Sequence, residues 1–239
     1  MIMMVDFKDF VYKNGNYFVI KTGNTLTKRS LKVNEDLISD FPDSIDLKIT
    51  NQCSCGCPFC HENSVPNGKS YNFDNTIKIL SQLPKLPIEL AIGGGNVLEI
   101  PDKTIKLLEW CNEYGFRTRI TVNKNDLTFN KDLVRTNILN NIFYNHVSTI
   151  GVSISDEKFL NEIILNNPTY TYFDNLWLYN KVFHIISGVF PTNKVYDLIN
   201  SGKKILILGY KQWGRGINYK HSNLLEFEIE VKKAILILL

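Results

Sequence analysis

The most constraining feature of this sequence is a regular alternation of apolar strand-like segments with helix-like segments after residue 44. The strand-like segments are 44–50, 88–92, 117–123, 148–155, 182–190 and 204–210. Segments with a helical spacing of apolar residues follow them, at 73–83, 101–115, 131–143, 157–165 and 192–202. This alternation with short connections predicts a parallel α/β architecture. Several strands are almost wholly apolar, which is typical of strands that are covered on both faces.

Local signals mark the ends of two of these helices. Asp74 or Asn75 is the expected N-cap of the helix over 73–83, because short polar side chains accept hydrogen bonds from the first turn. Pro101 falls in the first turn of the next helix, and Gly115 is its expected C-cap. Cys111 falls on the apolar face of this helix, so we expect it to be a small buried residue.

Residues 1–40 follow a different pattern. Asn14 and Gly15 stand between two apolar and aromatic runs, and this pair favours a type I′ turn. A second turn signal follows at Gly23 and Asn24. We therefore expect a small N-terminal β-hairpin appendage over 1–40, ahead of a main domain over 41–239.

Composition excludes some classes of protein and favours others. The net charge is +3 with basic residues scattered along the chain, which argues against an obligatory nucleic-acid binder or a membrane-surface binder. The first ten residues lack the features of a signal peptide, and the apolar tail AILILL is too short to span a bilayer. The default expectation is a cytoplasmic protein. Thiols stay reduced there, so clustered cysteines indicate metal or redox chemistry.

Four of the five cysteines lie within eight residues, in the segment CSCGCPFC. Cys53, Cys57 and Cys60 have the spacing C-x3-C-x2-C, and Cys55 is an additional thiol. The segment follows a predicted strand directly, on the face where active sites of barrel-like α/β folds gather. Three thiolates cannot fill the four protein positions of a closed iron–sulfur cluster. One iron would stay open to another ligand, which indicates catalysis rather than electron storage.

The segment LKITNQCSCGCPFC resembles the radical S-adenosylmethionine (SAM) enzymes, and the resemblance extends over about residues 45–216. It implies a partial (β/α)6 TIM-like barrel and a [4Fe–4S] cluster on Cys53, Cys57 and Cys60, the catalytic and metal-binding residues. Phe59 matches the aromatic residue before the last cysteine. The family binds SAM at the open iron and cleaves it with one electron to a 5′-deoxyadenosyl radical. That radical abstracts hydrogen from a substrate, and the protein binds, orients and shields the reacting groups.

Gly93, Gly94 and Gly95 follow the second strand of the main domain. They form neither a P-loop nor a G-x-G-x-x-G motif, and a simple tight turn is the alternative. The run resembles the glycine-rich motif that contacts the methionine amino group of the cofactor in this family. Relatives have Gly-Gly-Glu-Pro where this chain has GGNV, so Asn96 replaces the acidic residue. The contact would then be neutral or made by backbone carbonyls, and we assign no role to nearby Glu99.

Other strand ends provide polar groups on the same side of the predicted sheet. Thr121 and Asn123 follow the third strand, and Ser153 and Ser155 follow the fourth. The resemblance implies that Ser153 lies near the ribose and carboxylate of the cofactor, although an ordinary polar loop residue is the alternative. It also implies that the sixth strand, at Gly209, contacts the adenine.

Several residues near these segments have two interpretations. His184 could face the barrel interior, but a core histidine is the preferred interpretation. Lys211 and Arg215 could meet an anionic substrate or the cofactor carboxylate, or could lie in a solvated basic loop. His61 and Glu62 could support the cluster, or could be simply exposed.

The main rival is a non-catalytic metal-binding module, either a zinc protein or an iron–sulfur electron carrier. A structural zinc site usually takes two separated ligand pairs, and the sequence has no second pair. A relative that keeps the cluster without turnover is a further alternative. A rival triplet of Cys55, Cys57 and Cys60 lacks the family spacing, so we expect Cys55 to be a bystander. Expected partners are an unidentified small-molecule, peptide or nucleotide substrate and a donor such as flavodoxin or ferredoxin.

Overall fold

The larger sheet contains six parallel strands in chain order. In the computed structural model, residues 9–23, 25–123, 141–142, 146–154, 156–164 and 181–219 are described. The sheet order is β4-β5-β6-β7-β8-β9, and each neighbouring pair is parallel. The strands are β4 (Ser44–Thr50), β5 (Glu89–Gly94), β6 (Arg117–Asn123), β7 (Thr149–Ser153), β8 (Lys181–Ile186) and β9 (Ile205–Leu208). The predicted parallel α/β architecture is therefore confirmed.

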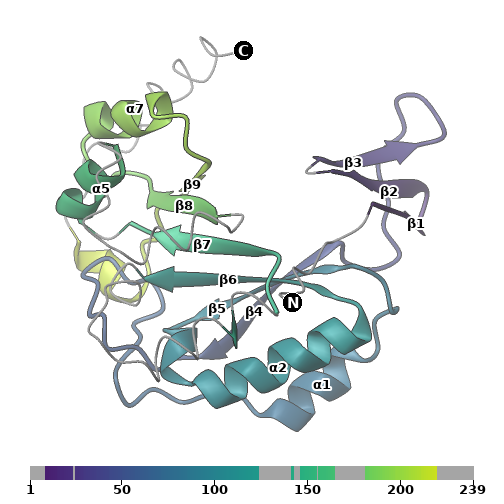
Figure 1. The fold of residues 1–239 in the computed structure, drawn as a ribbon, viewed down its shortest axis with the longest axis horizontal. Helices are drawn as coiled ribbons and strands as arrows, with labels where there is room; N and C mark the ends of the chain where they lie inside the picture. Colours follow the sequence, from purple (N-terminus) through teal and green to yellow (C-terminus); the bar gives the residue numbers. More distant parts are fainter. Residues whose placement is uncertain are drawn as a thin grey trace.

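The sheet curves, and the helices lie along the outside of the curve (Figure 1). These helices are α1 (Phe73–Leu80), α2 (Pro101–Tyr114), α5 (Glu157–Ile164) and α7 (Thr192–Asn200). Short 3-10 helices η1 (Val97–Glu99) and η2 (Gly214–Asn218) follow β5 and β9. Within the described residues β4 and β9 do not pair, so the sheet is open. The predicted TIM-like barrel is therefore not confirmed.

The two faces of the sheet differ in chemistry because strand side chains alternate between them. Leu90 and Ile92 of β5 and Ile120 and Val122 of β6 are buried in the core that the helices cover. The intervening residues face the inner, concave side. Arg119 of β6 forms an ion pair with Glu89 of β5 on this inner face. The core thus lies outside the curve and leaves the inner face for polar groups.

The helix ends agree in part with the sequence signals. Asn72 is the N-cap of α1, and its side chain accepts a hydrogen bond from the backbone of Asn75 at 2.9 Å. The expected N-cap at Asp74 or Asn75 is therefore wrong by two or three residues, because the chain enters the helix earlier. The second helix is as predicted: Pro101 opens α2, and Gly115 ends it with φ of 101°. Cys111 is fully buried, as predicted.

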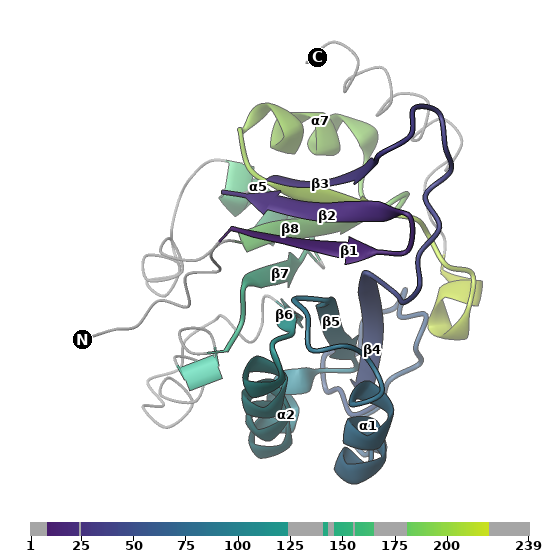
Figure 2. The ribbon, with the colours of Figure 1, turned by 90° about the vertical axis from the view of Figure 1, so that its right-hand side faces the viewer.

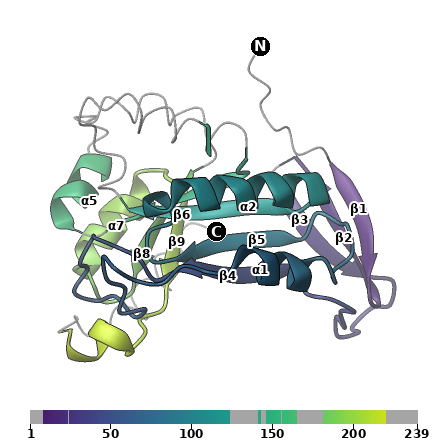
Figure 3. The same cartoon turned by 90° about the horizontal axis from the view of Figure 1, so that it is seen from below.

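The N-terminal sheet has three antiparallel strands, one more than the expected hairpin. The strands are β1 (Phe10–Asn14), β2 (Tyr17–Thr22) and β3 (Thr25–Ser30), in that order. A tight turn joins β1 to β2 at the predicted place, with Asn14 paired to Tyr17 and with Gly15 and Asn16 as its central residues. The expected type I′ turn is wrong, because Gly15 has φ of 60° but Asn16 does not have positive φ, and type I′ requires positive φ at both central positions. Figures 2 and 3 show this sheet beside the larger one, at the end of its strands that lies away from η2.

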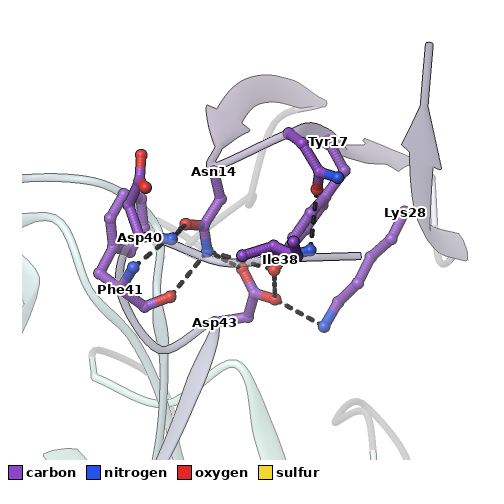
Figure 4. Close-up of polar contacts among 8 residues, drawn as sticks. Asn14, Tyr17, Lys28, Ile38, Asp40, Phe41 and Asp43 are labelled. Carbon is purple, nitrogen blue, oxygen red and sulfur yellow. Dashed lines mark hydrogen bonds and ion pairs between the residues drawn. The ribbon is translucent and has the colours of Figure 1, made fainter. Parts of the chain in front are cut away.

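A partly buried polar cluster joins the small sheet to the first strand of the large one (Figure 4). The Asp43 carboxylate accepts hydrogen bonds from Tyr17 and from Asn14, the latter at 2.6 Å, and pairs with Lys28 at 2.6 Å. Asn14 is fully buried and also donates to the carbonyl oxygen of Phe41 at 2.8 Å. Because every strong acceptor here has a donor, the cluster fixes the direction in which the chain enters β4.

Some sequence predictions lie outside the described residues. They are Ser155 and most of the helix expected over 131–143. Within the described residues, no helix combines the length and the apolar character that crossing a membrane requires.

Candidate metal and cofactor site

The cysteine loop begins where β4 ends, as the sequence predicted. Cys53, Cys55, Cys57 and Cys60 are all partly exposed, and none of them forms a disulfide. The loop turns back on itself through a bond from the Cys60 amide to the Cys57 carbonyl at 3.2 Å. Its start is held by a bond from the Cys53 amide to the Val65 carbonyl at 2.9 Å. The four thiols are thus presented at the carboxyl end of the parallel sheet.

The glycine run supports the cysteine loop from the neighbouring strand. The Gly95 amide donates to the Thr50 carbonyl at 2.7 Å. Gly94 has φ of 118°, and a Cβ there would lie 2.3 Å from that same carbonyl oxygen. A Cβ on Gly95 would lie 2.3 Å from the Gln52 carbonyl oxygen. These two glycines are therefore needed for close contact between backbones, whereas Gly93 has open space around it.

Asn96 is buried, and its side chain is used within the protein. Its Oδ1 accepts from the Leu98 amide at 3.0 Å, which makes it the N-cap of η1. Its Nδ2 donates to Glu99 at 3.3 Å, and its backbone amide donates to the Gln52 carbonyl at 2.7 Å. Asn96 thus joins η1 to the start of the cysteine loop.

The segment after β9 returns to the cysteine loop and holds it from the other side. Arg215 donates from Nε to the Cys57 carbonyl at 3.0 Å and from a terminal nitrogen to the Ser64 carbonyl at 2.9 Å. Its backbone amide donates to the Cys60 carbonyl at 3.0 Å. Gly214 has φ of 56°, and a Cβ there would lie 2.6 Å from a loop carbonyl oxygen. Lys211 and Arg215 are the two cationic groups expected to meet an anionic ligand. The Arg215 side chain donates to carbonyl oxygens of the cysteine loop, and Lys211 is exposed.

Two other sequence candidates lie close to these elements. Phe59 is buried and makes an edge contact with Tyr219, with ring centroids 5.5 Å apart. Gly209 follows β9 directly and has open space around it. Glu62 pairs with Lys48 and lies 3.3 Å from the His61 ring nitrogen, so neither expected supporting residue is simply exposed.

The environment of Cys57 fits a bound cationic group. Burial raises the pKa of its thiol above the ordinary value, and the nearby thiols of Cys53 and Cys60 raise it further. The side-chain amide of Asn123 lies 3.8 Å from its sulfur, within the range of a weak hydrogen bond. A positively charged metal centre stabilises the thiolate form of a cysteine, so it would offset the effect of burial and of the neighbouring thiols on Cys57. The residues present therefore fit a [4Fe–4S] cluster, which takes thiolate ligands.

Polar groups line the inner face next to this loop. Asn123, Ser153 and His184 occupy matching positions on β6, β7 and β8. His184 is half-buried on this face, so the preferred interpretation as a core histidine is wrong. A Cβ on Gly151 would lie 2.3 Å from the imidazole, so this glycine leaves room for the ring. Burial lowers the pKa of His184, and the positive charge of Arg119 lowers it further.

Comparison with known proteins gives a structural similarity. No family model and no curated protein matches the sequence. The structure of Streptococcus suis SuiB, a radical SAM enzyme, bound to the precursor peptide SuiA matches with a TM-score of 0.55 and 16% identity. The match covers 83% of this chain and 47% of that chain, so this chain spans about half the length of SuiB. The chain therefore has a fold similar to that of SuiB.

Proposed function

We propose that this protein is a radical SAM enzyme that abstracts hydrogen from a substrate still to be identified. The observation that carries the proposal is the meeting of two segments at one end of the sheet. The cysteine loop with the C-x3-C-x2-C spacing lies directly on the glycine run that follows β5. The similarity of fold to SuiB agrees with this assignment.

In this proposal each part of the site has a separate task. Cys53, Cys57 and Cys60 would hold a [4Fe–4S] cluster, which with SAM supplies a 5′-deoxyadenosyl radical by one-electron reductive cleavage. Gly93 and Gly209 have open space around them and leave the backbone accessible to the cofactor. Ser153 lies beside Asn123 on the inner face, where it can donate to the cofactor or substrate.

The inner face is the proposed place for the substrate. His184 and Thr121 lie there close to Gly151, and both offer hydrogen-bonding groups. SuiB is bound to a precursor peptide in the structure that matches this chain. We therefore include a peptide among the proposed substrates of this chain, together with an electron donor such as flavodoxin or ferredoxin.

The test is cofactor cleavage under anaerobic conditions. The full chain is reconstituted with iron and sulfide, reduced with dithionite and mixed with SAM, and 5′-deoxyadenosine is measured by mass spectrometry. We expect this product from the wild type and from Cys111→Ser, whose residue is buried away from the loop. We expect none from Cys57→Ala. Bound iron without this product would indicate a non-catalytic cluster protein.

Ligand choice is tested in the same preparations by iron and sulfide content. Cys53→Ala, Cys57→Ala and Cys60→Ala should each lose the cluster, and Cys55→Ala should retain it. A full complement of iron in Cys53→Ala would show that the ligand set is wrong.

A further inference from the structure

We propose that the cysteine loop contains a second metal site, which binds a single zinc-like divalent ion through Cys53, Cys55 and Glu99. One ligand atom from each of these three residues lies within 4.8 Å of the other two. Two of the residues come from the loop after β4, and the third comes from η1 after β5. The site is therefore assembled by the same strand pair that supports the cysteine loop.

The Glu99 carboxylate is held in place by groups that leave it able to bind a cation. The Ser54 amide donates to one carboxylate oxygen at 2.8 Å, and the Ser54 hydroxyl donates to the other at 3.2 Å. Asn96 donates to the first oxygen at 3.3 Å. Hydrogen bonds of this kind orient the carboxylate ligands of metal sites. Oε1 already accepts two hydrogen bonds, whereas Oε2 accepts one and keeps a lone pair for the ion.

Ser54 also explains why the two thiols lie together. It stands between Cys53 and Cys55, so its two bonds to Glu99 hold the chain that carries both sulfurs. Gly56 follows with φ of 63°, which reverses the chain immediately after the second thiol. The three ligand residues are therefore positioned by contacts that do not depend on the metal.

The donor set selects the class of ion. Two thiolates and one carboxylate suit zinc and similar borderline-soft divalent ions, whereas magnesium and calcium require oxygen ligands. Zinc in a site with three protein ligands keeps a fourth position for water or another small ligand. Because all three residues are partly exposed, an ion can reach the site from solvent.

Sharing of Cys53 gives the site a consequence for the proposed enzyme. If Cys53, Cys57 and Cys60 hold the cluster, the two kinds of metal cannot occupy the loop at the same time. The single ion would then protect the loop thiols and would have to leave before the cluster is assembled. This consequence rests on the proposed function, but binding of zinc to Cys53, Cys55 and Glu99 does not.

The direct test is zinc affinity of the full chain, free of iron and fully reduced under anaerobic conditions. Zinc is titrated in competition with a chromophoric chelator. We expect one tight site in the wild type. Cys55→Ser and Glu99→Gln should each weaken it by more than about tenfold, since even the outer partners of a metal site are worth about that much. Cys57→Ser is the matched control and should bind zinc as the wild type does.

Two outcomes would overturn the proposal. Unchanged zinc affinity in both Cys55→Ser and Glu99→Gln would show that neither residue is a ligand. Loss of zinc binding in Cys57→Ser would show that zinc instead uses the proposed cluster ligands. Circular dichroism and thermal unfolding confirm that each variant is folded, and Glu99→Gln keeps the size of the side chain in case Cys55→Ser is unstable.

A second experiment separates this site from the proposed enzymatic function. Protein loaded with one equivalent of zinc is exposed to iron and sulfide, and cluster formation is followed by absorbance. Zinc should slow cluster formation in the wild type but not in Glu99→Gln. If zinc slowed cluster formation equally in the wild type and in Glu99→Gln, the inference that zinc and the cluster both use Cys53 would be wrong. Failure to cleave SAM would leave the zinc affinities unaffected, so the two proposals fail independently.

Discussion

Replacement of Arg215 by methionine should loosen the cysteine loop and destabilise the protein. The guanidinium makes two good hydrogen bonds to loop carbonyls, at 3.0 Å and 2.9 Å, and a weaker one to Asn63 at 3.4 Å. A hydrogen bond from a charged donor contributes about 1.5–3 kcal/mol net. Because the loop is partly exposed, water replaces some of the lost contacts. We therefore expect a loss of about 2–3 kcal/mol in the free energy of unfolding.

The assay is urea unfolding of the iron-free, reduced chain, together with the rate at which the loop thiols react with a disulfide reagent. Arg215→Met should lower the unfolding midpoint and raise the reaction rate of Cys57, whose carbonyl it no longer holds. The rates are compared at equal thiolate fraction, because loss of the positive charge also raises the pKa of this thiol. Arg215→Lys should recover only part of the effect, because an ammonium group cannot make the same fork of hydrogen bonds. Lys211→Met is the control, since Lys211 is exposed on the same segment.

One result would refute this reasoning. If Arg215→Met had the same unfolding midpoint and thiol reactivity as Lys211→Met, the guanidinium would contribute nothing to the loop. The backbone bond from residue 215 to Cys60 would then be sufficient by itself.

Two further predictions concern the glycine run and the partly buried polar cluster. Gly94→Ala should lower the free energy of unfolding by about 2 kcal/mol, from backbone strain and a clash with Thr50, whereas Gly93→Ala should change it by less than about 0.5 kcal/mol in urea unfolding. Equal losses of unfolding free energy in the two variants would show that Gly94 is not in close contact with Thr50. Asp43→Ala should cost about 3 kcal/mol at pH 7 because it leaves partly buried donors unpaired. Burial alone would raise the pKa of Asp43. The hydrogen bonds from Lys28, Tyr17 and Asn14 have a larger combined effect in the opposite direction, so the pKa lies below its ordinary value. The stability that the ionised carboxylate provides is therefore present above about pH 4 and lost below it, so the difference from wild type should shrink in acid. A constant difference from pH 7 to pH 3 would refute this assignment.

The parallel strands could be predicted because several are short apolar runs and all alternate regularly with helix-like segments. β3 could not, because its sequence TLTKRS is polar and most of its residues are exposed. Only its pairing with β2 makes it a strand. The N-cap of α1 could not be predicted either, because Asn72 precedes the apolar residues whose spacing identifies the helix.

The cysteine loop and the glycine run could be located from local spacing. The groups that hold them could not. Glu99 reaches Ser54 across 45 positions, and Arg215 reaches Cys57 across 158. An acidic residue in a turn and an arginine in a loop have no local pattern that predicts their partners. The face of the sheet on which His184 lies could not be predicted, because a histidine within an apolar run gives the same sequence pattern whether it faces the core or the inner face.

The separation between Cys57 and Arg215 also determines when the loop is completed during synthesis. At about 5–20 residues per second, 158 residues take roughly 8–30 s to be made after the thiols. Contacts so distant in sequence form late, because closing the intervening chain costs entropy before any contact repays it. For that interval the four thiols of the newly made chain lack the segment that later closes over them. The loop therefore takes its final shape only after the segment that follows β9 has been made.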